Sequence, residues 1–129
     1  GSPITKGWMS SRYGQRTDPF NGSLAWHAGV DFAGKLGGDI VAVASGVVTW
    51  ADDRYGYGNM VEINHGNGYK TRYAHCKELK VAVGDVVRKG DIVALMGSTG
   101  RSTGPHVHFE VYKNGRTVDP AAYIHRKPR

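Results

Sequence analysis

Apolar and polar residues alternate along much of this chain, and the other apolar positions form short runs between turn residues. A two-residue period places successive side chains on opposite faces of a strand, whereas a short apolar run is typical of a strand buried on both faces. No segment shows a helical period of useful length. We therefore predict strands over residues 40–44, 47–50, 60–63, 69–75, 83–87, 91–96 and 107–112.

Turn residues separate these predicted strands. Asn67-Gly68 lies between two of them and is a strong signal for a β-hairpin. Arg88-Lys89-Gly90 indicates a second tight turn, and the chain's 19 glycines are scattered between the apolar runs. Many short strands joined by such turns predict an all-β domain built of antiparallel sheets.

The length of 129 residues favours a single domain over residues 1–129. We expect little helix, with one short turn over residues 120–124, and we interpret residues 1–38 as irregular, with a loop over residues 10–24. Residues 124–129 are expected to form a tail. Gly1-Ser2 is typical of the remnant of an expression tag, so the lack of a leader peptide does not indicate where the protein resides.

Lys and Arg exceed Asp and Glu by 17 − 11, which gives a net charge of +6. A basic protein favours anionic partners such as nucleic acid, acidic membrane surfaces or cell-wall polymer. The charges are dispersed except at the C-terminus, and no basic helix or aromatic ribonucleoprotein motif is present, so we do not expect nucleic acid. Cys76 is the single cysteine, and no apolar run reaches the roughly 20 residues of a membrane span.

Histidines and carboxylates cluster on one predicted face. His106, His108 and Glu110 alternate along a predicted strand and therefore share a face. Glycine and valine between His27 and Asp31 favour an extended segment, in which these two residues also share a face.

A further strand adds to the same face. His75 ends the strand that begins near Tyr69, and Tyr73 shares its face by the same rule. Buried polar groups are costly unless paired, and a metal would pair several of them at once. We expect one sheet surface to collect His27, Asp31, Tyr73, His75, His106, His108 and Glu110.

Two imidazoles and one carboxylate, from His27, Asp31 and His108, make a three-ligand set for a metal. On a tetrahedral zinc ion this set leaves the fourth position open, which distinguishes a catalytic site from a closed structural one. The sequence therefore predicts a metal-dependent hydrolase that holds one Zn²⁺ ion.

Several candidates keep a second interpretation. Glu110 is either a surface carboxylate or a group that orients a ligand histidine, and Tyr73 is either part of the site or a cross-strand packing residue. His65 is expected to be an exposed turn residue and His125 a solvated residue of the tail. Cys76 follows His75 and is expected to point into the core on the opposite face.

The chain resembles the lysostaphin-type (LytM-type) zinc endopeptidases that cut the peptide part of the bacterial cell wall. The resemblance runs from about Ser11 to Tyr123, with its motifs in the family's order. One departure is Cys76, where relatives often carry leucine. The matching pieces are Ser11-Arg12-Tyr13-Gly14, His27-Ala28-Gly29-Val30-Asp31-Phe32, Val43-Ala44-Ser45-Gly46-Val47-Val48, Tyr73-Ala74-His75, Gly97-Ser98-Thr99-Gly100 and Gly104-Pro105-His106-Val107-His108-Phe109-Glu110.

This resemblance implies a β-rich fold with a substrate groove across a sheet. It places zinc on His27, Asp31 and His108 and makes His75 and His106 the catalytic histidines, without assigning which one is the general base. The implied substrate is the peptide cross-link of peptidoglycan, with a D-alanyl–meso-diaminopimelate bond as the expected point of cleavage. Residues expected to line the groove lie in predicted loops: Tyr13, Trp26, Tyr55 and Tyr57.

The resemblance also implies a setting. We expect a bacterial cell-envelope enzyme, periplasmic in a Gram-negative cell, that acts as a monomer on peptidoglycan stem peptides. Other envelope domains, an adaptor or an inhibitory segment are expected outside residues 1–129.

Two other functions compete with this interpretation. Some relatives lose zinc ligands and act as regulators that bind and activate other wall hydrolases, but all three ligands and both partner histidines are present here. The segment Val83–Asp91 also resembles part of a biotinyl or lipoyl carrier domain. Such a carrier needs a modifiable lysine at a hairpin tip, which no hairpin here offers in the usual setting, and it would leave the histidines unexplained.

Overall fold

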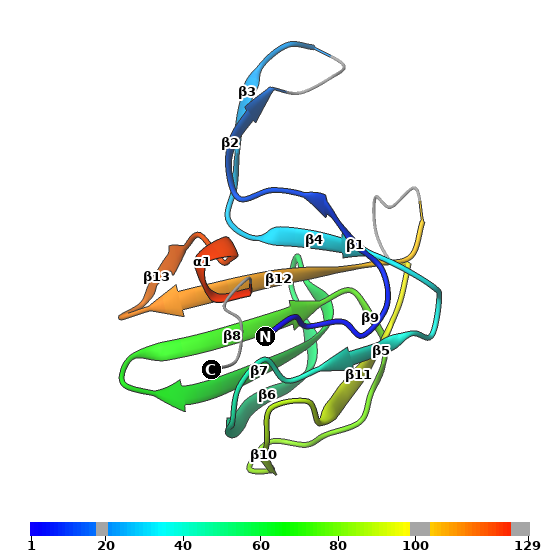
Figure 1. Cartoon of the computed structure of the whole chain (residues 1–129), viewed down its shortest axis with the longest axis vertical. Helices are drawn as coiled ribbons and strands as arrows, with labels where there is room; N and C mark the ends of the chain where they lie inside the picture. The colour runs from blue at the N-terminus through cyan, green and yellow to red at the C-terminus, as the bar shows by residue number, and fades with distance from the viewer. Residues whose placement is uncertain (18–20, 99–103, 125–129) are drawn as a thin grey trace.

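The computed structural model describes residues 1–17, 21–98 and 104–124 of the chain, and within them nearly all regular structure is β-strand (Figure 1). The one described helix is the short α1 (Ala121–Ile124), at the predicted position. The strands are β1 (Trp8–Ser11), β2 (Gly14–Thr17), β3 (Leu24–His27), β4 (Val30–Ala33), β5 (Asp39–Val41), β6 (Gly46–Arg54), β7 (Gly58–Gly66), β8 (Tyr69–Ala74), β9 (Cys76–Leu79), β10 (Val86–Val87), β11 (Ile92–Met96), β12 (His106–Lys113) and β13 (Arg116–Val118).

One large sheet organises the molecule. Its strands follow the order β1-β4-β12-β8-β7-β6-β10, and β13 pairs with β12 beside this path. A smaller sheet has the order β5-β11-β9, and β2 and β3 pair with each other alone. This β2–β3 hairpin projects away from the rest of the molecule (Figure 1). All the strand pairs described are antiparallel, which confirms the predicted all-β class.

The predicted hairpin at Asn67-Gly68 joins β7 to β8. Both residues have positive φ angles, 53° and 82°, which the turn that best matches the twist of a hairpin requires. The turn at Arg88–Gly90 is also present, closed by a hydrogen bond from the Asp91 amide to the Arg88 carbonyl. The strands on either side of that second turn do not pair, because β10 joins β6 in the large sheet and β11 joins the smaller sheet.

The N-terminal third of the chain departs from the prediction. Residues 1–38 were expected to be irregular, but they contain β1, β2, β3 and β4. These strands have only four residues each, too few to show a clear apolar period, and none of the side chains described in β2 and β3 is buried. Strand β13 is short and was missed for the same reason.

The hydrophobic core lies between the large sheet and the smaller one. Val61, Tyr73 and Phe109 of the large sheet belong to the same buried cluster as Val93 and Met96 of β11. Because side chains alternate along a strand, the residues between these core positions of β7, β8 and β12 point to the other face of the large sheet. That face carries the candidate chemistry. Within the described residues, no helix is long and apolar enough to cross a membrane.

Candidate metal centre

Strand β12 carries two histidines and a glutamate on one face. Val107 and Phe109 have no exposed surface and point into the core, so His106, His108 and Glu110 point the other way, as the alternation predicts. In the antiparallel register, His108 lies opposite Asp31 of β4 on one side and opposite Ala74 of β8 on the other. The small alanine limits crowding beside the imidazole ring.

His27 and Asp31 meet because the chain bends between them. The sequence suggested one extended segment, in which four residues would span about 13 Å. Instead, β3 ends at His27 and β4 begins at Val30. His27 Nε2 lies 3.4 Å from Asp31 Oδ2, and His108 Nδ1 lies 2.9 Å from Asp31 Oδ1. The predicted grouping is present, but the predicted local geometry was wrong.

Gly29 permits this bend. A Cβ atom at this position would lie 2.4 Å from the Phe109 carbonyl oxygen and 2.9 Å from His108 Cε1. Real Cβ contacts are essentially never so short, and the closest obstacle is backbone, which cannot rotate away. The connection between His27 and Asp31 therefore lies directly against β12 only because it lacks a side chain at residue 29.

The three donors fit a divalent zinc ion. Ligand atoms of His27, Asp31 and His108 all lie within 4.8 Å of one another. In a tetrahedral site with bonds near 2.0–2.1 Å, ligand atoms are about 3.3 Å apart, close to the 3.4 Å between His27 and Asp31. The Nδ1 atom of His27 lies 2.8 Å from the Arg12 carbonyl oxygen, which can only accept, so Nδ1 carries the proton and Nε2 offers its lone pair.

Glu110 orients the His108 ring by contacting the ring nitrogen that does not face Asp31. The His108 Nε2 atom lies 2.9 Å from Glu110 Oε2, which leaves Nδ1 to face Asp31 and the candidate metal position. A carboxylate on the distal ring nitrogen fixes the orientation and tautomer of a ligand histidine. Glu110 is buried, with 4% of its surface exposed, so it is not a surface carboxylate.

The metal-free site is strongly coupled electrostatically. Burial opposes the charge on His108, but the hydrogen bonds that its ring donates to Asp31 and Glu110 outweigh it and raise the pKa of His108 to about 9. Burial would also raise the pKa of Asp31, yet the hydrogen bond from His108 and the contact with His27 hold that pKa well below its usual value. The pKa of Glu110 is likewise lowered, against its burial, by the hydrogen bond from His108. In the absence of metal, a proton on His108 therefore balances two carboxylates.

His75 reaches this face through a break in the strand. After β8 ends at Ala74, His75 adopts a left-handed backbone conformation with φ 63°, and its amide donates to the Tyr57 carbonyl over 2.8 Å. Positive φ is uncommon for residues other than glycine, although histidine is among those that tolerate it. The His75 ring centroid lies 5.1 Å from that of His106 and 6.3 Å from that of His108.

The same break corrects the prediction for Tyr73. A continuous strand would place Tyr73 and His75 on one face, but the reversal at His75 separates them. Tyr73 has no exposed surface, packs on Phe109 with centroids 5.2 Å apart, and its hydroxyl accepts from the Val43 amide over 3.1 Å. Burial raises its pKa to about 12. Tyr73 is a core residue and does not belong to the site.

The environment of the second histidine pair differs from that of the first. Burial lowers the pKa of His75, and the nearby charges of His106 and His108 lower it further. His106 Nδ1 lies 3.2 Å from the Gly104 carbonyl oxygen, and its amide donates to the Gly97 carbonyl over 3.0 Å. A half-buried imidazole with a lowered pKa is neutral at physiological pH and is able to accept a proton.

A row of polar residues across three strands supports Glu110. Arg72 of β8 lies opposite both Glu110 of β12 and Glu62 of β7. Its Nε donates to Glu62 Oε2 over 2.7 Å, and its NH1 group donates to the hydroxyls of Tyr57 and Tyr112 over 3.0 Å each. Both hydroxyls in turn donate to Glu110 Oε1 over 3.0 Å. Hydrogen bonds therefore run from Glu62 of β7 through Arg72 and the two tyrosines to Glu110, which contacts His108.

Sequence reasoning named Glu110 and Tyr57 but missed the residues that join them. Arg72 and Tyr112 occupy the site-facing positions of their strands, so the alternation along β8 and β12 was a signal available in the sequence. Tyr57 has two roles, because its hydroxyl contacts Glu110 while its carbonyl accepts from the His75 amide.

The other predicted residues lie apart from the donor cluster. Trp26 is on β3 and not in a loop, is 63% exposed, and packs edge-on against Tyr13 with centroids 5.2 Å apart. Tyr55 is fully exposed. Cys76 is buried in the core as expected, and burial raises the pKa of its thiol to about 12.

The sequence predicts that His65 and His125 lie outside the site. The prediction for His65 as an exposed turn residue was wrong, because it lies in β7, half buried, with its ring nitrogens 2.8 Å from the Ser45 carbonyl and 2.7 Å from Thr71 Oγ1. His125 lies outside the described residues.

Curated relatives share this sequence over most of its length. A DD-carboxypeptidase/endopeptidase of Neisseria meningitidis serogroup B is 42% identical over 120 residues, which cover 93% of this chain and 28% of that protein. A peptidoglycan DD-endopeptidase of Vibrio cholerae, ShyA, is 39% identical over 119 residues, or 91% of this chain and 28% of that protein. The chain thus spans little more than a quarter of the length of these relatives.

Solved structures share the fold. A zinc-containing peptidase from Vibrio cholerae superposes with a TM-score of 0.85 and 34% identity over 99% of this chain and 40% of that one. The catalytic domain of lysostaphin from Staphylococcus simulans superposes with a TM-score of 0.82 and 32% identity over 93% of both chains. The model of peptidase family M23 matches residues 25–120, which include the whole donor cluster. This chain belongs to peptidase family M23.

Proposed function

We propose that this domain is a zinc-dependent endopeptidase that hydrolyses peptide cross-links of bacterial peptidoglycan. The observation that carries the proposal is the convergence of His27, Asp31 and His108 beside a second pair of histidines. Family membership and the similarity to enzymes named as endopeptidases support it.

His27, Asp31 and His108 would hold the zinc ion, through Nε2, a carboxylate oxygen and Nδ1 respectively. A zinc ion held by these donors would supply a Lewis acid that activates water and the carbonyl of the scissile bond. The protein supplies the donors in a fixed arrangement. Glu110 holds the His108 ring by its Nε2 atom, and Arg72 and the two tyrosines hold Glu110.

His75 and His106 would handle protons during the reaction. One imidazole accepts a proton from the attacking water, and the other donates a hydrogen bond to the developing oxyanion. A neutral His75 suits the first role because its lowered pKa leaves it unprotonated near pH 7. Positioned proton transfer of this kind contributes about 10²–10⁴ in rate.

The bond between D-alanine and meso-diaminopimelate is our proposed point of cleavage, which agrees with the names of two relatives, a DD-carboxypeptidase/endopeptidase and a peptidoglycan DD-endopeptidase. The exposed Trp26 and the half-buried Tyr13, which pack against each other, would contact the substrate beyond the donor cluster. We also propose an envelope location, periplasmic in a Gram-negative cell. Action as a monomer and control by domains or adaptors beyond these 129 residues complete the proposal.

A regulator without catalytic activity is the alternative function. Such a protein would retain the fold and would not need the zinc donors. Here the donors, their supporting carboxylate and the partner histidines are all in place within the described residues. This observation favours the enzyme.

Defined cross-linked muropeptides test the proposal. The zinc-loaded protein is incubated with a dimer linked from D-alanine to meso-diaminopimelate, and the products are identified by mass spectrometry. We expect two monomeric stem peptides, and none when zinc is omitted or when His108 is replaced by alanine. An intact dimer after prolonged incubation with zinc-loaded protein would refute the enzymatic function, and cleavage at another bond would refute the proposed specificity.

A further inference from the structure

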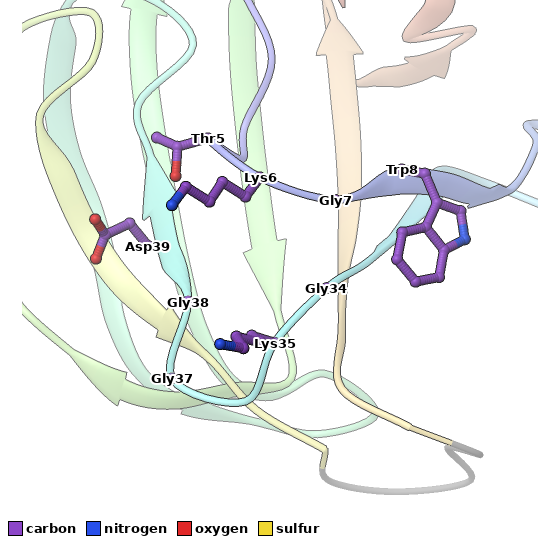
Figure 2. A pocket seen from close by; sticks show the side chains of 9 residues that line it. All are labelled: Thr5, Lys6, Gly7, Trp8, Gly34, Lys35, Gly37, Gly38 and Asp39. Carbon is purple, nitrogen blue, oxygen red and sulfur yellow. The ribbon is translucent and has the colours of Figure 1, made fainter.

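A hollow lies beside the N-terminal segment, where the chain leaves β4 (Figure 2). Its volume is about 550 Å³, within the range of small-ligand pockets. Four of its nine lining residues are glycines, so much of its wall is formed by main-chain atoms. The lining residues are Thr5, Lys6, Gly7, Trp8, Gly34, Lys35, Gly37, Gly38 and Asp39.

One edge of this hollow lies on the face that carries the metal centre. Trp8 of β1 lies opposite Ala33 of β4, and Ala33 lies opposite His106 of β12. Cross-strand partners share a face, and Ala33 shares a face with Asp31, two residues or about 7 Å along the strand. The Trp8 ring, 64% exposed, therefore lies on the same face as the zinc donors and lines the hollow at that edge.

The hollow carries charges of both signs. Lys6 and Lys35 line it together with Asp39, and in Figure 2 the Lys6 side chain extends toward Asp39 while Lys35 rises from the turn after β4. Among the described residues, none of these three side chains forms an ion pair with another protein group. In contrast, the exposed Lys80 pairs with Glu78. The hollow thus offers two ammonium groups and one carboxylate to a ligand.

Two glycines let this wall form. A Cβ at Gly7, where φ is +131°, would collide with the Ala33 carbonyl oxygen, and one at Gly34 would lie 3.1 Å from the Lys6 carbonyl oxygen. The N-terminal segment therefore packs closely on the chain that leaves β4, and Lys6 is brought to the same hollow as Lys35 and Asp39.

We propose that this hollow binds the free amino-acid end of a diaminopimelate side chain, one residue away from the bond that is cut. The proposal rests on the proposed function and names how the site recognises its substrate. The lysines would hold the carboxylate, Asp39 would accept from the ammonium group, and Trp8 would pack against the methylene chain between the substrate backbone and that charged end.

The chemistry and reach of the ligand agree with this assignment. The side chain of a stem-peptide diaminopimelate that is not itself cross-linked ends in one carbon bearing both an ammonium and a carboxylate. In the stem that donates the D-alanine carbonyl, this residue directly precedes the D-alanine. Its side chain spans several carbon–carbon bonds, which suits the distance of about 7 Å along β4 between Asp31 and the Trp8 edge of the hollow.

Binding of two stem tetrapeptides to the zinc-free protein tests the proposal without cleavage. The probes are L-Ala-γ-D-Glu-diaminopimelate-D-Ala and the same peptide with lysine in place of diaminopimelate, which lacks only the distal carboxylate. By calorimetric titration, we expect the wild-type protein to bind the diaminopimelate peptide roughly fivefold to tenfold more tightly, the scale of two partly exposed ion pairs. The double variant Lys6→Gln/Lys35→Gln should bind both peptides equally.

Matched variants separate the contacts. Lys89→Gln removes one positive charge from a turn outside the hollow and should keep the wild-type preference. Asp39→Asn should weaken both peptides alike, because both carry the ammonium group. A double variant that keeps the wild-type preference, or a wild-type protein that shows none, would overturn the proposal. The muropeptide cleavage assay with zinc judges the proposed function separately, since a protein that cuts the dimer but shows no preference fails only here.

Discussion

Two pairs of histidines lie on one face of the large sheet with the same separation but different surroundings. The ring centroids of His27 and His108 are 5.1 Å apart, and so are those of His75 and His106. Carboxylates contact the first pair and raise the pKa of His108, whereas the second pair lies beside other imidazoles and the pKa of His75 is lowered. Under the proposed function, the first pair would hold the metal beside its carboxylates, and the second pair, where burial lowers the pKa of His75, would accept a proton.

Removing a ring from the first pair should have the largest effect. We expect His108→Ala to lose both zinc and cleavage, because the metal keeps only two protein ligands and Glu110 loses its partner. Zinc content is measured by mass spectrometry of the metal, and cleavage with the muropeptide dimer. His65→Ala removes a histidine elsewhere on the large sheet and should retain both; a zinc-loaded, active His108→Ala protein would contradict the assignment.

Removing a ring from the second pair should separate chemistry from metal binding. We expect His75→Ala to keep one zinc ion per chain and to lose about 10²–10⁴ in kcat, the contribution of a positioned acid or base. The measurement pairs metal analysis with single-turnover cleavage. Wild-type turnover in this variant would remove His75 from the mechanism.

The carboxylate that orients His108 can be changed while all three proposed zinc ligands remain. Glu110→Gln keeps the size of the side chain but removes the charge that faces His108 Nε2, so zinc affinity should fall about 10–100-fold. Competition with a chelator measures the affinity. Glu62→Gln makes the same change on the other side of Arg72 and should have a smaller effect; equal losses would show that general destabilisation, and not the contact with His108, is responsible.

Without zinc, the stability of the protein should depend on pH, because His108 of the first pair then titrates. In the metal-free fold the pKa of His108 is raised from 6.5 to about 9, so the protonated ring stabilises the fold. This contribution is complete below pH 6.5 and is lost as the pH rises through 9, and we expect a loss of about 3 kcal/mol in unfolding free energy. Urea unfolding of zinc-free protein at both ends of this window measures it.

The zinc-loaded protein provides the control for that measurement. Metal in place of the Nδ1 proton removes the titration of His108, so its contribution to the pH dependence should disappear. A zinc-free protein equally stable across the window would contradict the raised pKa.

The sequence predicted the strand-borne part of the site well. The period of two residues in His106, His108 and Glu110 is a local property of an extended chain, and the structure keeps it. The same rule failed at Tyr73, because the left-handed backbone of His75 interrupts it, and no neighbouring glycine marks that reversal. It also failed for the bend before Asp31, which depends on contact with β12.

Contacts between distant strands were the part that sequence reasoning could not supply. Arg72 and Tyr112 are 40 positions apart, and their hydrogen bond depends on the register between β8 and β12. An arginine on a strand is usually a solvated surface residue, so the residue type alone does not predict that Arg72 joins two buried glutamates. The fold class was predictable because it depends on many turns and apolar runs, whereas the supporting row depends on single pairings.

The close packing of Gly29 against β12 limits how this metal centre could be redesigned. Combinatorial libraries that randomise residues 27–31 would sample nineteen side chains at a position where any Cβ meets the Phe109 carbonyl oxygen at 2.4 Å. Most members would displace the loop before their new donor atoms were ever tried. An engineer seeking a different metal preference should therefore hold that codon constant and place diversity in the imidazole and carboxylate positions on either side.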